Sequence, residues 1–112
     1  MKIDFHSQDD ITIVTLSGEL NGRTVPDVQA QLMPYIQPGC KIVLDLRHVT
    51  YMSSAGLRFM LLIHRQTTNQ GGRVVITGLS EWVEDTMSIT GFLDFFEVYD
   101  SLETGVEAVR QN

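Results

Sequence analysis

Two adjacent serines, Ser53 and Ser54, are the residues of this chain whose type and position best suit a chemical role. They follow the apolar run at residues 42–46 and lie at the predicted start of an apolar helix. Unpaired backbone N–H groups and the positive end of the helix dipole meet there and tolerate an anion. A phosphate would add roughly two negative charges, which an acidic or apolar partner surface would repel. The pair therefore indicates a phosphorylation switch that controls a protein complex.

Two other roles fit a serine at a helix start. Catalysis by Ser54 would need a positioned base, but no G-x-S-x-G elbow precedes the helix. The three histidines, His6, His48 and His64, show no triad spacing. A helix cap with no further role is common for serine at such positions. We favour the phosphorylation switch over the cap alone and disfavour catalysis.

The sequence contains no recognisable metal or cofactor motif. The acids Glu81, Glu84 and Asp85 lack the pattern of a calcium loop, and Cys40 with the scattered histidines lacks zinc spacing. The glycine pairs lack the G-x-x-x-x-G-K pattern of a phosphate-binding loop. We therefore expect no cofactor, no bound metal and no enzymatic activity.

Length and charge limit the class of protein. A chain of 112 residues can fold as one domain, residues 1–112, without a disulfide or metal. The formal net charge of −6 argues against general binding to nucleic acid or anionic membranes, because both ligands are negatively charged. The single cysteine, Cys40, fits a reducing compartment, and no apolar run approaches the roughly 20 residues of a membrane span. The N-terminus also lacks the apolar region of a signal peptide, so we expect a cytoplasmic protein.

The charged residues are unevenly distributed along the chain. Residues 41–73 contain five basic side chains and the single acid Asp45, whereas residues 81–107 contain eight acids and no lysine or arginine. This distribution fits one locally basic face. It also fits the simpler interpretation, which we favour, that acids and bases mix once the chain is folded.

Alternation of apolar and polar residues predicts two strands at the start of the chain. Ile3 and Phe5 alternate with polar neighbours, and residues 11–17 alternate in the same way. A turn near residues 8–10 would make the two strands an antiparallel edge pair, and Gly18 would end the second strand.

A helix and a buried strand are expected next. Thr24 offers an N-cap, Pro26 lies near the first helical position, and the Pro38-Gly39 pair would stop the helix. Residues 41–46 are almost wholly apolar, which is typical of a strand covered on both faces. We expect this strand to be central in the sheet.

The second half of the chain predicts a βαβ unit followed by three further elements. A helix from about Ser54 to Thr68, ended by glycines, joins the central strand to a buried strand at residues 74–76. Such a unit is parallel and right-handed. The further expected elements are a helix from Ser80, a strand at residues 96–99 and a helix at residues 101–110.

The predicted helix after Ser53 is unusually apolar. Burial of its apolar side chains between neighbouring elements is the expected outcome, with exposure to a partner as the alternative. Ser54, Arg58, Leu61 and Arg65 nevertheless follow helical spacing and form a semi-polar stripe that begins at the hydroxyl. This stripe would face solvent or a docked protein.

At five segments the sequence resembles the STAS domain family, and within it the stand-alone bacterial anti-sigma factor antagonists. These segments are LSGEL at residues 16–20, IVLDL at 42–46, VTYMSSAGL at 49–57, GRVVI at 72–76 and GF at 91–92. The resemblance implies an α/β fold: a STAS-like mixed sheet of about five strands with about four helices packed mainly on one side.

The resemblance also implies a function and its partners. In this family the unphosphorylated antagonist binds an anti-sigma factor, a histidine-kinase-like ATPase that acts as a serine kinase, and thereby frees the sigma factor. Phosphorylation releases the antagonist, and a metal-dependent serine phosphatase resets it. Matching the motifs places the phosphoacceptor at Ser54, with Ser53 as the alternative. The sequence departs from the family pattern at Ser53, where aspartate is frequent, and at Arg58, where glycine is frequent.

The expected contact surface combines two segments of the chain. It contains Ser53, Ser54, Arg58 and Leu61, together with Asn21, Gly22 and Arg23, because the C-terminal ends of parallel strands meet at one edge of the sheet. A constitutive docking subunit of another assembly, in lipid transport or other signalling, is the alternative function. An enzyme or small-ligand module is a third class, which no residue pattern favours.

Overall fold

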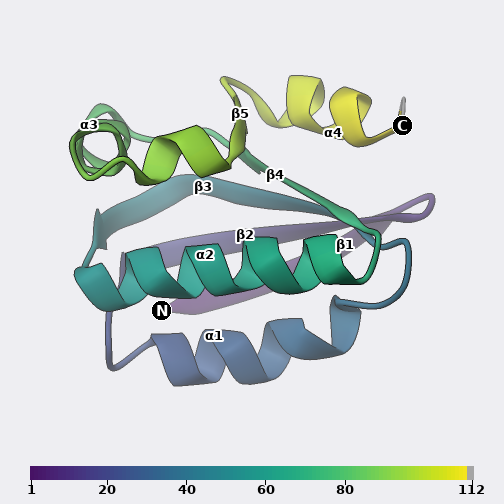
Figure 1. The fold of residues 1–112 in the computed structure, drawn as a ribbon, viewed down its shortest axis with the longest axis horizontal. Helices are drawn as coiled ribbons and strands as arrows, with labels where there is room; N and C mark the ends of the chain where they lie inside the picture. The colour runs from purple at the N-terminus through teal and green to yellow at the C-terminus, as the bar shows by residue number, and fades with distance from the viewer. Residues whose placement is uncertain (111–112) are drawn as a thin grey trace.

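The computed structural model describes residues 1–110, whose strands form a five-stranded sheet (Figure 1). In spatial order the strands are β1 (Lys2–Gln8), β2 (Ile11–Leu20), β3 (Lys41–Met52), β4 (Arg73–Thr77) and β5 (Glu97–Tyr99). β1 pairs antiparallel with β2, and all other neighbours are parallel. The sheet is therefore mixed, with β3 at its centre, as the apolar run at residues 41–46 predicts.

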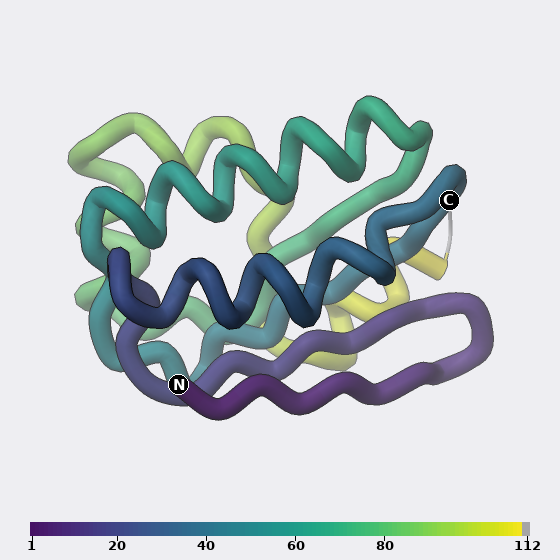
Figure 2. The backbone as a smooth tube through the Cα atoms, turned by 90° about the horizontal axis from the view of Figure 1, so that it is seen from below, coloured from purple at the N-terminus to yellow at the C-terminus, as the bar shows by residue number. Residues whose placement is uncertain are grey.

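Helices cover both faces of this sheet unequally. The helices are α1 (Val25–Leu32), α2 (Ser54–Asn69), α3 (Glu81–Ile89) and α4 (Leu102–Arg110), with short 3-10 turns η1 (Met33–Tyr35) and η2 (Phe92–Phe95). The first three helices pack on one face, where α1 and α2 run side by side (Figure 2), and α4 packs on the other. This arrangement confirms the expected STAS-like architecture.

The alternation of side chains along β3 explains why residues 41–46 are almost wholly apolar. Ile42, Leu44 and Leu46 are buried in the core beneath α1, α2 and α3. Val43 points to the opposite face and packs with Val106 of α4. Both faces of the strand are thus removed from water at residues 42–46, which is the usual setting of a parallel strand.

β3 is longer than the apolar run, so the predicted end at residue 46 is wrong. The strand continues to Met52, and its pairing with β2 persists across two register shifts (bulges), the first of which follows the Thr15–Asp45 pair. The Asp45 side chain is buried beside this bulge, where it accepts hydrogen bonds from Arg47 backbone N–H (3.1 Å) and Arg47 Nη2 (3.2 Å). The buried acid is therefore satisfied by the residue that the bulge presents.

Two other boundaries and one helix cap also differ from the sequence predictions. Gly18 does not end β2, which continues to Leu20, because this glycine lies at the second register shift with φ of 114°. α1 ends at Leu32 rather than at Pro38, since Pro34 has no N–H to donate to the helix. The Thr24 side chain precedes α1 but does not cap it, because its oxygen accepts instead from the Asn21 N–H at 2.9 Å.

Candidate functional site at the start of α2

The start of α2 is held against the end of β2 by a close backbone approach. The Ser53 backbone N–H donates to the Leu20 carbonyl at 3.0 Å. A Cβ placed on Gly56 would lie 2.6 Å from the same carbonyl oxygen and 2.9 Å from Met52 Cγ. Only glycine fits this contact, so Gly56 fixes where the first turn of α2 meets the sheet.

The two serines at this helix start have different environments. Ser53 is the N-cap, and its half-buried side-chain oxygen accepts a hydrogen bond from Gly56 N–H at 3.3 Å. Ser54 is the first residue of α2 and is exposed. Its hydroxyl makes no side-chain hydrogen bond to any of residues 1–110, histidines included. The structure therefore gives the capping role to Ser53 and leaves the Ser54 hydroxyl accessible.

The turn at residues 21–23 lies beside the same helix start, as the parallel topology predicts. The Asn21 side-chain oxygen accepts from Arg23 N–H at 2.9 Å, which fixes the turn. A Cβ on Gly22 would lie 4.0 Å from the Ala55 Cβ, an ordinary contact distance. Both Gly22 and Arg23 are exposed. The structure thus brings this turn and Ser54 to one end of the molecule.

The semi-polar stripe of α2 runs between two shallow grooves. Arg58 is exposed and lines a groove of about 300 Å³ between α1 and α2, together with Gly22, Ala55 and Leu62. Leu61 is half-buried and lines another groove of about 290 Å³ with Phe95 on the opposite flank of α2. Arg58 and Leu61 therefore both lie on the outward side of α2, but they line different grooves.

The basic side chains near the helix start are unpaired, whereas others form ion pairs. Arg73 pairs with Glu97 and Lys41 pairs with Asp10, so basic and acidic segments mix as the simpler interpretation of the charge distribution predicts. Neither Arg23 nor Arg58 forms an ion pair with any of residues 1–110. A phosphate on Ser54 would thus meet an unpaired guanidinium at Arg58, one helical turn away.

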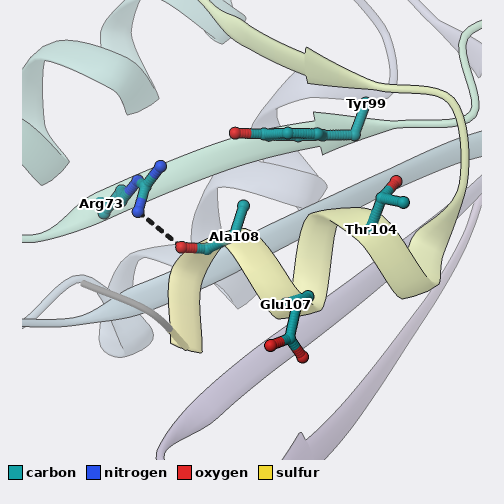
Figure 3. Close-up of a pocket in the computed structure, with 5 residues that line it drawn as sticks. All are labelled: Arg73, Tyr99, Thr104, Glu107 and Ala108. Atoms are coloured by element: carbon teal, nitrogen blue, oxygen red, sulfur yellow. Dashed lines mark hydrogen bonds between the residues drawn. The ribbon is translucent and has the colours of Figure 1, made fainter.

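The part of the chain that the structure describes holds no group of three or more His, Cys, Asp and Glu residues able to bind a metal. No helix among residues 1–110 combines the length and hydropathy that crossing a membrane requires. A hollow of about 470 Å³ lies beside α4, where Arg73 points to the Ala108 carbonyl (Figure 3). The Arg73 guanidinium also binds both carboxylate oxygens of Glu97, so it is occupied within the fold.

The sequence pattern did not predict an exposed aromatic pair near Ser54. The rings of Tyr51 and Trp82 lie 5.3 Å apart, and these residues are 40% and 50% exposed. An aromatic residue in an amphipathic helix is usually interpreted as core, which hides such a pair from sequence analysis. The acids Glu81 and Asp85, one residue before Trp82 and three residues after it, were the available signal that this residue faces water.

Comparisons with known proteins show which family this chain resembles. The STAS domain family model matches residues 2–105. The Bordetella bronchiseptica protein BtrV is 33% identical over 111 residues, which are 98% of this chain and 96% of BtrV. The anti-sigma-B factor antagonist of Staphylococcus epidermidis is 31% identical over 104 residues, which cover 92% of this chain and 96% of that protein.

Two solved structures show the same fold at lower identity. They are of the Bacillus protein SpoIIAA, in its unphosphorylated and phosphorylated forms, with TM-scores of 0.75 and 0.72 and identities of 17% and 18%. The similarity covers 99% of this chain and 100% of SpoIIAA in the first comparison, and 96% and 99% in the second. With the family model matching almost the entire described sheet and its helices, this chain belongs to the STAS domain family.

Proposed function

We propose that the chain is an anti-sigma factor antagonist that acts by phosphorylation-gated partner switching. The unphosphorylated protein binds an anti-sigma factor of the histidine-kinase-like ATPase type, which is also its serine kinase. Phosphorylation of Ser54 releases the complex, and a metal-dependent serine phosphatase restores the binding form. The contact surface contains Ser53, Ser54, Arg58, Leu61 and the turn at residues 21–23, and the exchange takes place in the cytoplasm.

The observation that carries this proposal is the exposed hydroxyl of Ser54 at the first position of α2. Ser53 is engaged as the cap through its contact with Gly56 N–H, so phosphorylation there would break a helix-capping contact. A phosphate on Ser54 would instead meet the positive end of the helix dipole without replacing a hydrogen bond. This difference supports Ser54 as the phosphoacceptor and Ser53 as a structural residue.

The names of two relatives support the same function. The S. epidermidis protein is named for antagonism of an anti-sigma-B factor. The SpoIIAA structures carry the name anti-sigma factor antagonist for the unphosphorylated form and cell fate determinant for the phosphorylated form. A STAS domain of this architecture thus exists in both states, which is what a phosphorylation-gated antagonist requires.

The charge of residue 54 provides the sharpest test of gating. Ser54→Asp and Ser54→Asn have side chains of similar size and differ in charge. We expect Ser54→Asn to bind the anti-sigma factor within a few-fold of the wild-type affinity. Ser54→Asp should bind at least about tenfold more weakly, because its carboxylate would be repelled by an acidic partner surface or would lose its hydration against an apolar one. Calorimetric titration against purified histidine-kinase-like ATPases from the same genome measures both. Equal affinities for these variants would contradict gating and indicate constitutive docking.

Charge reversal at Arg58 tests the contact surface itself. We expect Arg58→Glu to weaken the complex by about tenfold or more, since Arg58 lies one helical turn from Ser54 and is unpaired among residues 1–110. Arg65→Glu makes the same charge change about two turns further along α2 and is the matched control. An unchanged affinity of Arg58→Glu would remove Arg58 from the interface.

A further inference from the structure

The Tyr51–Trp82 pair is an exposed aromatic surface that the fold does not need to bury. Tyr51 lies near the end of β3, and Trp82 lies in the first turn of α3. Their rings meet at a centroid distance of 5.3 Å and an interplanar angle of 33°. Half-exposed tryptophan and tyrosine side chains are the residue types that most often anchor protein interfaces.

This pair lies at the same end of the molecule as Ser54. Tyr51 precedes the N-cap Ser53 by two residues, so the aromatic pair adjoins the start of α2. Figure 1 shows α3 and the start of α2 at the same end of the sheet. The pair therefore continues the candidate contact surface on the side of Ser54 that faces away from α1.

The exposed side of α3 combines apolar and acidic groups. Trp82, Asp85 and Ile89 follow helical spacing along one face, and all three are exposed, Ile89 to 86%. Asp85 forms no ion pair with any of residues 1–110, and α3 contains no basic residue. A planar cation matches this face, because it can stack on the indole ring while it pairs with a carboxylate one helical turn away.

We propose that the Tyr51–Trp82 pair, with Asp85, is a second half of the docking surface and receives an arginine-bearing segment of the anti-sigma factor. This inference rests on the proposed function, because it names the chemistry by which the same partner is recognised. The unpaired Arg23 and Arg58 give the opposite half of the surface a positive charge. The surface thus has a basic side and an acidic, aromatic side, with Ser54 between them, and this polarity orients the partner.

Removal of each aromatic ring tests the proposal. Trp82→Ala and Tyr51→Ala are each expected to weaken binding of the unphosphorylated protein to the anti-sigma factor by about 30-fold, the effect typical of a buried interface anchor. Tyr35→Ala is a matched control, because Tyr35 is 38% exposed and also stacks on one aromatic ring, that of Phe5. The partner is the histidine-kinase-like ATPase of the same genome that binds the wild-type chain. Wild-type affinity in both Tyr51→Ala and Trp82→Ala would overturn the proposal.

Charge reversal separates the acidic contribution from the aromatic one. Asp85→Lys is expected to weaken the complex by about tenfold and to reduce its sensitivity to salt. Glu103→Lys is the matched control, since Glu103 is an exposed helix acid on α4 without an ion pair to residues 1–110. An equal loss of affinity in the two variants would show that net charge alone acts, which contradicts a specific cation contact at Asp85.

A direct probe of this surface is available because Trp82 is the single tryptophan of the chain. In protein labelled with fluorotryptophan, its fluorine NMR resonance should lose the solvent isotope shift when the anti-sigma factor binds. Retention of that shift in a formed complex would place the partner elsewhere and overturn this inference, while the proposed function would stand. A wild-type chain that binds none of the ATPases would instead contradict the proposed function. A different outcome is disappearance of the solvent isotope shift in the free chain as its concentration rises, together with self-association in sedimentation. That result would assign the surface to a second copy of this chain and overturn the proposal.

Discussion

At the residue scale, the two adjacent serines have different environments, which the sequence alone does not distinguish. Both are hydroxyls at the start of a helix, and motif matching prefers Ser54 while retaining Ser53 as the alternative. In the structure, the Ser53 side chain caps α2 and the Ser54 side chain is exposed. The capping contact and the accessible hydroxyl thus belong to neighbouring residues. A modification of Ser54 would therefore leave the Ser53 cap in place.

This separation predicts different effects on stability. Ser53→Ala should lower the free energy of unfolding by about 1 kcal/mol, because the Gly56 N–H loses its capping acceptor. Ser54→Ala should change it by less than about 0.5 kcal/mol, as is usual for an exposed side chain. Urea denaturation followed by circular dichroism measures both. A larger loss for Ser54→Ala than for Ser53→Ala would show that the assigned cap is wrong.

At the element scale, α2 is positioned by the missing side chain of Gly56. The close approach of this glycine to the Leu20 carbonyl joins the end of β2 to the first turn of the helix. The same contact places the turn at residues 21–23 next to Ser54. The site is therefore assembled from two ends of parallel strands, and its geometry depends on one backbone contact.

Substitution of Gly56 should disturb this assembly. Gly56→Ala is expected to destabilise the fold by about 1–3 kcal/mol, because the added Cβ would overlap the Leu20 carbonyl oxygen. Gly22→Ala is the control, since its Cβ would make an ordinary contact with Ala55, and its stability should stay within about 0.5 kcal/mol of wild type. Thermal denaturation compares them, and a neutral Gly56→Ala would contradict the close contact.

The order of elements follows from the sequence, whereas several boundaries do not. The β3–α2–β4 unit is predictable because an almost wholly apolar run, a helix-start signal and a second apolar run follow each other. The two bulges of β3 cannot be predicted from the sequence. They depend on the register of β3 against β2 and on the hydrogen bond from Arg47 N–H to the buried Asp45. The end of α1 can be predicted from Pro34, because proline has no backbone N–H to donate to the helix.

For the candidate site, too, the sequence predicts some features and not others. The proximity of Ser54 to the turn at residues 21–23 can be predicted from motif and topology, because parallel strand ends meet at one edge. The Tyr51–Trp82 pair cannot be predicted in this way, since contact between a strand end and a later helix is a tertiary feature. Hydrophobic periodicity assigns Trp82 an apolar position without specifying which neighbour covers it.

At the scale of the whole molecule, Arg73 adds polar contacts to the apolar packing of α4 on the sheet. Arg73 of β4 binds both carboxylate oxygens of Glu97 in β5 and donates to the Ala108 carbonyl of α4 at 2.6 Å (Figure 3). The hydrogen bonds from Arg73 hold the pKa of Glu97 below its ordinary value. These contacts connect three elements on the face opposite to the candidate site, and they make stability depend on the charge of Glu97.

This network predicts a pH-dependent contribution to stability. Because the pKa of Glu97 is lowered by folding, its ionised form stabilises the fold above the unfolded-state value of about 4.3. That contribution is lost as the pH falls through the lower folded-state pKa. Glu97→Gln should therefore be less stable than wild type at neutral pH, and the difference should shrink in acid. Urea titrations across this pH range test it, with Glu103→Gln as an exposed control, and a constant difference would contradict the prediction.

The central claim is that Ser54 is the residue whose phosphorylation releases the partner. Its most direct test is incubation of the protein with ATP and purified histidine-kinase-like ATPases of the same genome, followed by intact mass measurement and peptide mapping. We expect one phosphate on Ser54, absent from Ser54→Ala and retained in Ser53→Ala, and loss of the complex once that phosphate is present. A phosphate on Ser53, or a complex that survives full phosphorylation of Ser54, would contradict it.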